Sequence, residues 1–450
     1  MTPASALVAL VVAPGVLFAV LALLWLLGLT PGERFIARST AVLYLALTGV
    51  ALWLGWFLWS TGQPSVYAEG ADWFQSGEYR FNLSLLADHL SWPLLTVTVM
   101  LVGLVGAFSV RYLHRDRGYF RFFALLHLFC FGSMLVLAAG TYDLLLGGWE
   151  LVGISSVLLV AFFDERREPV RNAVRVFAFY RIADLGLLIG IFLLHHSAHT
   201  TGAKDLFHGA WPNDTANIGA TAATAIGLML LMAAAGKSAQ APFSGWLPRA
   251  MEGPTPSSAI FYGAISVHLG AYLLLRSEPI FRQAPIAAAA VGVVGGVTAV
   301  LASIVHRSST DAKTSLAYAG MAQLGIIFVE IAAGFPQLAL FHIMGHAVVR
   351  TLQFLRAPSM LHDYHRVHAA AGGHLGKTGE HYVAILPGPV RVWIYRAAVE
   401  RMYYDGLLDR LVVGPVLRLA RALEAIEEGA APATPGQSQP AARLAQGVES

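Results

Sequence analysis

Residues 236–248 read GKSAQAPFSGWLP and follow directly on a long apolar stretch. Lys237 therefore stands at the end of a membrane-length segment, where an ionisable side chain is costly and usually functional. Pro242 and Pro248 interrupt helical hydrogen bonding just beyond it. Irregular backbone at membrane depth is tolerated only against protein or a water-filled cavity. A charge beside a broken helix is typical of proteins that move ions across membranes.

The composition is that of a polytopic membrane protein. Of 450 residues, 56% are hydrophobic and only 13% are charged, and the mean hydropathy is +0.60. Soluble domains carry roughly 25% charged residues. The net charge of +3 forms no single basic patch that would indicate nucleic acid, and the lone Cys130 allows no disulfide framework. No soluble catalytic domain and no cofactor motif is recognisable in the sequence, so we expect no bound cofactor or metal in this chain and no stand-alone enzyme.

Stretches of roughly 20 apolar residues predict membrane-spanning helices. About eleven such stretches occur by this rule, and the first is read as a retained helix, because it is too long for a signal sequence and lacks a basic flank. They lie near residues 4–29, 37–60, 91–112, 120–139, 142–163, 172–195, 217–237, 257–275, 285–305, 313–333 and 337–356. The predicted fold is an all-α membrane bundle with at least one broken helix, at Lys237.

Basic residues alternate between the loops and predict the orientation. Arg34, Arg115, Arg166 and Arg307 stand in the loops after the first, third, fifth and ninth spans, whereas the 62–90 loop is acidic. By the positive-inside rule, the N-terminus lies outside and the C-terminal region in the cytoplasm. The expected location is a bacterial inner membrane.

The chain divides into three predicted parts: a membrane domain over 1–357, a cytoplasmic segment over 358–428 and a disordered tail over 429–450. In the second part, residues 389–424 alternate apolar and arginine side chains, as amphipathic helices do at a membrane surface or partner groove. This part also holds five histidines, for which a solvated loop is favoured over a metal site because no standard zinc spacing occurs. They are His362, His365, His368, His374 and His381.

Polar residues recur inside the apolar spans. Glu150 lies in mid-span, Asp184 follows Arg181 by about one turn, and His268 lies in the eighth span. Three more share one face of the eleventh span at four-residue spacing: His342, His346 and Arg350.

These residue types suit proton transfer. A lysine withdrawn from water can exist charged or neutral, depending on whether an acidic partner is near. Histidine titrates near neutrality and can relay protons between such sites. Glu150 and Lys237 are the predicted pair.

Other interpretations of these motifs are weaker. Gly236-Lys237-Ser238 is not a phosphate loop, since Leu231 stands where the first glycine is required. His342 and His346 have a zinc-like spacing but lack the intervening glutamate of a zinc protease helix. Asp184 and Arg181 could form only a local ion pair, and that alternative stays open.

Five segments closely resemble the signature of the antiporter-like subunits of NADH:quinone oxidoreductase, which are related to multisubunit cation/proton antiporters. They are GWELVG at 148–153, RIADLG at 181–186, GKSAQAPFSGWLPRAMEGPTPSSA at 236–259, DAKTSLAYAGMAQLG at 311–325 and FHIMGHA at 341–347. The resemblance covers roughly residues 80–357 and keeps the family's order.

The resemblance implies that Glu150 and Lys237 are the proton-transfer pair of a first half-channel. It places Asp184, Lys313, His342 and His346 on the family's polar axis. The family often has lysine where Arg350 stands, and arginine does not deprotonate, so Arg350 is expected to be a fixed charge or gate. The family also continues with a second broken helix and further spans after the eleventh, which puts a second half-channel in doubt here.

A shortened subunit with a cytoplasmic amphipathic segment resembles the membrane component of DAB-type inorganic-carbon accumulation complexes. The segment LRAPSMLHDYH at 355–365 is similar to that branch. The resemblance implies a large cytoplasmic partner similar to a β-carbonic anhydrase, with zinc in the partner, and cation flow that drives hydration of CO2 to bicarbonate. The coupling ion, H+ or Na+, is left open. Two other hypotheses are a subunit of a respiratory complex or Na+/H+ antiporter, and a non-transporting scaffold.

Overall fold

The computed structural model describes residues 2–359, apart from 71, 78, 208–210, 213–214 and 310, together with 385–403 and a few positions between 406 and 423. Over these residues eleven helices are long and apolar enough to cross a membrane. The predicted all-α membrane bundle is confirmed. The spans are α1 (Pro3–Leu26), α2 (Glu33–Thr61), α3 (Ser91–Tyr112), α4 (Tyr119–Ala138), α5 (Tyr142–Val160), α6 (Arg167–Ala198), α8 (Ala220–Lys237), Thr255–Arg276, α13 (Pro285–Ser308), α14 (Ala312–Ala332) and α15 (Pro336–Arg356).

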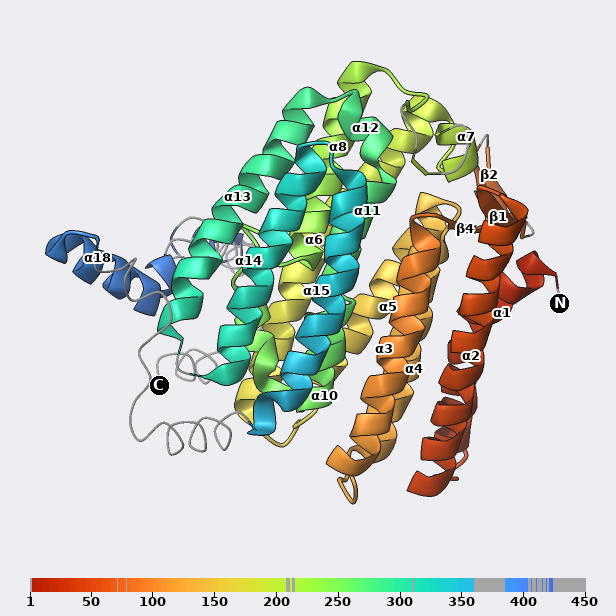
Figure 1. Ribbon diagram of the computed structural model, residues 1–450, viewed down its shortest axis with the longest axis horizontal. Helices are drawn as coiled ribbons and strands as arrows, with labels where there is room; N and C mark the ends of the chain where they lie inside the picture. The colour runs from red at the N-terminus through yellow and green to blue at the C-terminus, as the bar shows by residue number, and fades with distance from the viewer. Residues whose placement is uncertain are drawn as a thin grey trace, which may run out of the picture. The chain divides into compact units, whose positions relative to one another are not determined.

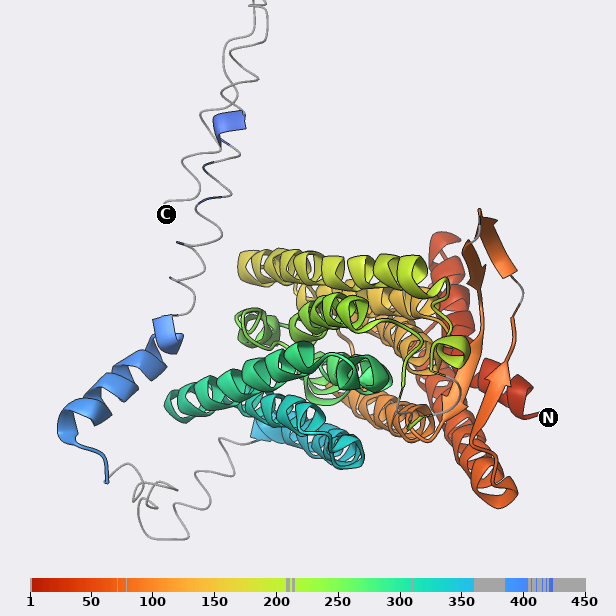
Figure 2. The ribbon, with the colours of Figure 1, turned by 90° about the horizontal axis from the view of Figure 1, so that it is seen from above.

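The spans run side by side, with α1 and α2 at one edge and α13, α14 and α15 at the other (Figures 1 and 2). Packing joins α1 to α4, α4 to α5, α5 to α6, α6 to α8, and α13 to α14. Thr255–Arg276 is the only one of these spans whose apolar window is buried throughout. The centre of the bundle is therefore this span.

Helix α8 ends at Lys237 because the backbone turns away there. Ser238 is the C-cap, and Ala239 has a φ of +51°, a left-handed conformation that costs an L-residue energy. Gly236 is required one residue earlier, since a Cβ at this position would collide with Ala183 of α6. The indole of Trp246 donates to the Gly236 carbonyl at 2.9 Å, which satisfies one of the free carbonyls at the helix end. The predicted break is thus confirmed.

Short helical pieces follow the break before the chain spans the membrane again. They are α9 (Trp246–Arg249), the 3-10 turn η1 (Ala250–Glu252), α10 (Thr255–Ser257), the π-helix η2 (Ser258–Ala264) and α11 (His268–Arg276). A π-helix is rare and commonly marks a functional position. The eighth span is therefore irregular along its first half.

Four short strands lie in the 62–90 loop, where the sequence predicted no strands. β1 (Ser65–Ala68) pairs antiparallel with β4 (Leu85–Asp88), and β2 (Asp72–Ser76) with β3 (Tyr79–Asn82). Their acidic and amide residues masked the alternating pattern that predicts strands. Two small helices complete the loops on this side, α7 (Ala203–Leu206) and α12 (Glu278–Arg282).

A buried ion pair fastens this loop to the end of α11. Asp88 is fully buried and accepts hydrogen bonds from Arg276 at 2.6 Å and 3.0 Å, while the backbone N–H groups of Ser91 and Trp211 donate to the same carboxylate. Burial raises the pKa of Asp88, but the charge of Arg276 and these hydrogen bonds outweigh it, so the pKa lies below its ordinary value. The carboxylate therefore stays ionised inside the protein.

The chain after α15 is described only in part. The 3-10 turn η3 (Ala357–Ser359) ends the eleventh span, and α18 (Gly388–Val399) is a helix within the predicted amphipathic segment, followed by η4 (Arg401–Tyr403). The five histidines between 362 and 381 and the tail from 429 lie outside the described residues. The domain boundaries at 357 and 428 stay predictions.

Candidate functional site

Lys237 is enclosed by aromatic rings at the helix break. Its side chain is 1% exposed, and its Nζ lies 4.6 Å from the ring centroid of Trp149 on α5 and 4.5 Å from that of Tyr180 on α6. The Nζ also donates to the Trp149 carbonyl at 3.2 Å. Ring faces attract a cation. Among the described residues no carboxylate forms an ion pair with this amine.

Glu150 and Asp184 are instead joined by an arginine. Arg181 donates from one nitrogen to the Glu150 carboxylate and to that of Asp184, the second at 2.8 Å. The Trp149 indole donates to Asp184 at 2.6 Å. Asp184 is buried, whereas the side chain of Glu150 is 28% exposed. The local pair of Arg181 and Asp184 therefore exists, but it is part of a three-residue cluster.

Glu150 and Lys237, the predicted proton-transfer pair, form no ion pair with each other in the part of the chain that the structure describes, and proton transfer between them stays a prediction. Lys237 binds the carbonyl of residue 149, next to Glu150 in the chain, and the indole of the same tryptophan binds Asp184. Trp149 thus lies between the amine and the carboxylates. The sequence predicted that the amine and the carboxylates gather, but not that Arg181 is the first partner of Glu150. The one feature of the sequence that indicated a role for Arg181 was its place in the segment RIADLG at 181–186.

Tyr180 packs against Lys237, and three buried hydroxyl groups lie in this region. The side-chain oxygens of Tyr180, Tyr262 and Ser266 form no well-aligned hydrogen bond with any residue that the structure describes, although those of Tyr180 and Ser266 lie close enough to interact. Trp246 stacks edge-on between the two tyrosines, with ring centroids 4.9 Å and 5.7 Å away. Buried polar atoms of this kind usually bond ordered water. The region between Lys237 and α11 is therefore suited to hold water.

Two histidines meet beyond these hydroxyls. His268 on α11 and His346 on α15 share a hydrogen bond of 2.8 Å between their rings, and Arg350 donates to His346 at 3.1 Å. Both histidines are buried. The ring of His342 lies 6.2 Å from that of His346. The predicted stripe of His342, His346 and Arg350 along α15 thus lies together with His268 of α11 in a row of polar side chains.

Glu330 extends this row, although the sequence did not predict it as a site residue. Its carboxylate lies 2.9 Å from one ring nitrogen of His342, and the Gln323 side-chain oxygen lies 3.1 Å from the other. Both ring nitrogens of His342 therefore lie within hydrogen-bonding distance of a side-chain oxygen. The only signal in the sequence was an isolated acidic residue in the apolar run IIFVEIA at 326–332.

Lys313 lies apart from these groups. Its Nζ donates to the backbone carbonyls of Gly253 at 2.9 Å and Met251 at 3.4 Å. It therefore ties the start of α14 to the irregular segment after the helix break. The structure does not bring it to the histidines.

No group of three or more histidine, cysteine, aspartate or glutamate residues within the described ranges is arranged to hold a metal ion. His342 and His346 each bind other protein groups instead, namely Glu330 and Gln323 for the first and His268 and Arg350 for the second.

Replacing Trp149 by phenylalanine is expected to destabilise the fold. The change removes the donor to a buried carboxylate oxygen of Asp184, and leaving such a group unsatisfied costs about 1–3 kcal/mol. The measurement is the free energy of unfolding in detergent. Trp92→Phe is the matched control, because its half-buried indole donates to a neutral carbonyl, that of Ala51. An equal or smaller loss in Trp149→Phe than in the control contradicts the role given to this hydrogen bond.

Comparison with known proteins matches the site-bearing half of the chain to one family. Residues 141–375, more than half of the chain, match the family described as NADH:quinone oxidoreductase/Mrp antiporter, TM. Residues 73–123 match NADH-Ubiquinone oxidoreductase (complex I), chain 5 N-terminus.

Two curated relatives show the extent of the similarity. NADH-quinone oxidoreductase subunit L of Pseudomonas aeruginosa is 38% identical over 293 residues, which are 64% of this chain and 47% of the relative. NADH-ubiquinone oxidoreductase chain 5 of Allomyces macrogynus is 36% identical over 278 residues, 62% of this chain and 43% of the relative. The chain thus spans about half the length of the curated relatives it matches.

Solved structures share the arrangement of helices. A chain of the Mrp complex from Dietzia sp. DQ12-45-1b is 27% identical with a TM-score of 0.64, covering 77% of this chain and 37% of that one. A chain of the membrane-bound sulfane sulfur reductase, an archaeal respiratory membrane complex, has a TM-score of 0.67 at 20% identity, covering 78% and 70%. The second likeness concerns the fold alone.

Proposed function

The chain belongs to the transmembrane family of NADH:quinone oxidoreductases and Mrp antiporters, and we propose that it is a proton-conducting subunit of a larger membrane complex. One observation carries the proposal. The amine of Lys237 is fully buried at a helix break, and the residue that it binds, Trp149, adjoins Glu150 in the chain and donates to Asp184. A buried amine with no structural ion pair is suited to gain and lose a proton.

The proposed route has two stages. In the first, Lys237 exchanges protons with the Glu150–Arg181–Asp184 cluster, across the short gap that Trp149 spans. In the second, the hydroxyls of Tyr180 and Tyr262 and bound water connect Lys237 to the histidines. Hydrogen-bonded chains of hydroxyls, water and imidazoles are able to pass protons in this way.

The residues along α15 complete the second stage. His268 and His346 are hydrogen-bonded to each other, and His342 lies next to them against Glu330. Arg350 keeps its charge and fixes the ring of His346. We assign Lys313 a positioning role, because its amine holds the backbone of the irregular segment.

We further propose that proton flow energises a partner that accumulates inorganic carbon. The partner is a large cytoplasmic protein similar to a carbonic anhydrase, whose zinc supplies the chemistry of CO2 hydration. Inward proton movement provides the free energy that keeps this hydration one-way. The support is the likeness of residues 355–365 to the DAB branch and the arginine-rich segment 389–424, which suits contact with a partner.

Glu150→Gln is expected to abolish growth that depends on inorganic-carbon accumulation. Glutamine keeps the size of the side chain and can accept from Arg181, but it cannot take up a proton at neutral pH. Growth of the host at ambient CO2 and at raised CO2 is the measurement, with growth restored only at raised CO2. Glu69→Gln is the matched control, since Glu69 is exposed and pairs with Lys204. Normal growth of Glu150→Gln at ambient CO2 would end the proposal.

A respiratory or Mrp-type role is the second candidate, and the likeness to subunit L and to the Mrp complex favours it. Affinity purification of the full chain separates the two. A zinc protein supports carbon accumulation, whereas flavin and iron–sulfur subunits, or small antiporter subunits, support the second role. A scaffold without transport predicts that neutralising Glu150, Lys237 and His346 together leaves the activity of the complex intact.

A further inference from the structure

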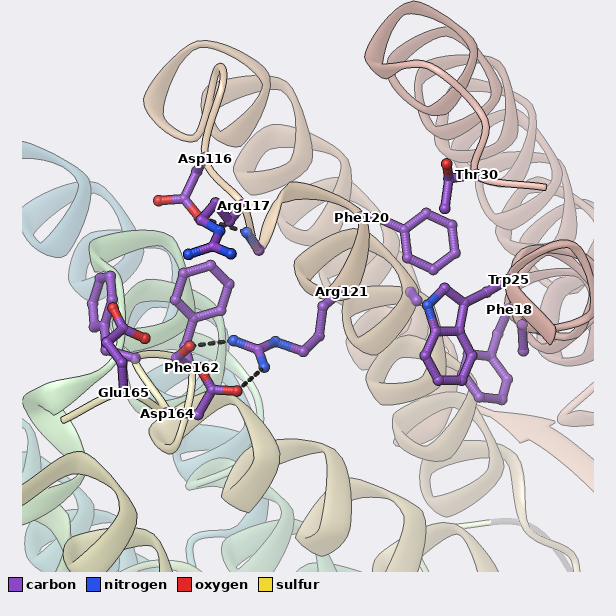
Figure 3. Close-up of a pocket in the computed structure, with 14 residues that line it drawn as sticks. Phe18, Trp25, Thr30, Asp116, Arg117, Phe120, Arg121, Phe162, Asp164 and Glu165 are labelled. Carbon is purple, nitrogen blue, oxygen red and sulfur yellow. Dashed lines mark hydrogen bonds and ion pairs between the residues drawn. The ribbon is translucent and has the colours of Figure 1, made fainter. Parts of the chain in front are cut away.

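A pocket of about 830 Å³ lies far from the proton-transfer residues, between α1, the start of α4 and the loop that joins α5 to α6. Figure 3 shows its two unlike ends. Aromatic side chains from α1 and α4 gather on one side, among them Phe18, Trp25 and Phe120. Charged side chains gather around Phe162 on the other side, from the loop before α4, the first turn of α4 and the loop after α5. The pocket is thus amphipathic.

The aromatic end reaches into the membrane-spanning part of the chain. Phe18, Ala22 and Trp25 share one face of α1, since they are four and three residues apart. Seven residues of helix measure about 10 Å along the axis. Trp25 is 60% exposed near the end of the helix, and tryptophan is enriched at the membrane–water boundary. An occupant therefore needs an apolar part about 10 Å long that lies in hydrocarbon.

The charged end offers both signs of charge. Arg121 donates to the Asp164 carboxylate at 2.8 Å and to the Phe162 carbonyl. The hydrogen bond from Arg121 to Asp164 holds the pKa of Asp164 below its ordinary value. Asp116 accepts from the Gly118 backbone at 2.7 Å. Arg117 and Glu165 line the same end and are exposed. A headgroup with one anionic and one cationic group matches this set.

We propose that the pocket binds one zwitterionic aminophospholipid, such as phosphatidylethanolamine. The phosphate lies against Arg117, the ammonium donates hydrogen bonds to Asp164 and Glu165, and an acyl chain runs along Phe18, Ala22 and Trp25. Basic pockets between membrane helices bind lipid headgroups in the same manner. The carboxylates add a preference for an amine that has N–H donors, which phosphatidylcholine lacks. This site is independent of the proton-conducting function.

Native mass spectrometry of the full-length chain tests the site. The protein is stripped of lipid in detergent, and phosphatidylethanolamine, phosphatidylcholine or phosphatidylglycerol is then added at the same concentration. We expect one tightly held phosphatidylethanolamine per chain and at least tenfold weaker retention of phosphatidylcholine. Phosphatidylcholine cannot form the charged hydrogen bonds between the ammonium and the carboxylates, and losing them lowers the binding affinity by about a factor of ten or more. A stronger or equal retention of phosphatidylglycerol overturns the proposal in favour of an anionic lipid.

Two variants and one control locate the binding. Arg117→Gln removes the phosphate partner, and Ala22→Trp fills the apolar end. Each is expected to lower phosphatidylethanolamine retention at least tenfold, by the same reasoning. Arg111→Gln removes the same charge from the neighbouring end of α3, where the residue does not line the pocket, and should retain lipid like the wild type. Equal retention in Arg117→Gln and Arg111→Gln overturns the proposal even if Ala22→Trp fails to fold.

Discussion

Lys237→Met is expected to reduce proton flux through the assembled complex by about 10²-fold, the scale on which a proton-transferring side chain usually contributes. Methionine has a similar length and fills the space between Trp149 and Tyr180, but it cannot carry a proton. Of the three lysines that the structure describes, only Lys237 is buried. Neither of the other two described lysines is therefore buried beside the helix break to replace it.

The fold should tolerate this change. Lys237 forms no ion pair with a described residue, and replacing it by an apolar side chain of similar length also removes the cost of keeping an ammonium away from water. Arg181 still forms ion pairs with both carboxylates. We therefore expect an unfolding temperature close to that of the wild type.

Flux is measured as the decay of an imposed pH gradient in proteoliposomes that contain the complex. Lys204→Met makes the same substitution at an exposed lysine whose partner is Glu69, and it should leave flux unchanged. Wild-type flux in Lys237→Met would remove the main support for the proposed function. Repeating the decay with a sodium gradient identifies the coupling ion.

Arg276→Met is expected to cost about 3–5 kcal/mol of stability, the usual result of leaving one member of a buried ion pair alone. Asp88 would be left at 0% exposure without the positive charge that offsets its desolvation, and its remaining donors among the described residues are backbone N–H groups and the Ser91 hydroxyl. The loop that carries β1 and β4 would then be released from α11. The measurement is the free energy of unfolding in detergent, together with the yield of folded protein.

The double variant Asp88→Asn with Arg276→Met isolates the electrostatic cause. It replaces the unpaired Asp88 carboxylate by a neutral amide and should recover part of the lost stability. Lys204→Met, which breaks an exposed ion pair on the same side of the bundle, should cost no more than about 1 kcal/mol. A double variant as unstable as Arg276→Met would show that packing, and not charge, fastens the loop.

The pH dependence of the wild type follows from the same pair. Because the folded pKa of Asp88 lies below its ordinary value of 3.8, the pair contributes fully above about pH 4. Its contribution is lost as the pH falls through the lower folded pKa. Acid unfolding of Arg276→Met should lack this component.

The order of spans could be predicted from the sequence because each helix satisfies its own backbone within one apolar stretch. The predicted and observed bounds agree to a few residues at each end; the largest difference is the sixth span, which begins at Arg167 and not at 172. The break at Lys237 was equally local, since Pro242 lies close to the last turn. The strands were not predicted because their pairing joins segments that are distant in the acidic loop, such as Ser65 and Asp88.

The chemically unusual residues can be recognised without a structure: they are charged and imidazole side chains within apolar spans, each of which carries a large desolvation cost. Which of these side chains touch one another depends on the folded arrangement of the helices. Arg181, and not Lys237, binds Glu150; Glu330 caps the histidine row; and Lys313 holds backbone. Such partners come from helices that are distant in the chain, and their contacts depend on how the helices are rotated against one another. Local periodicity carries no information about that rotation.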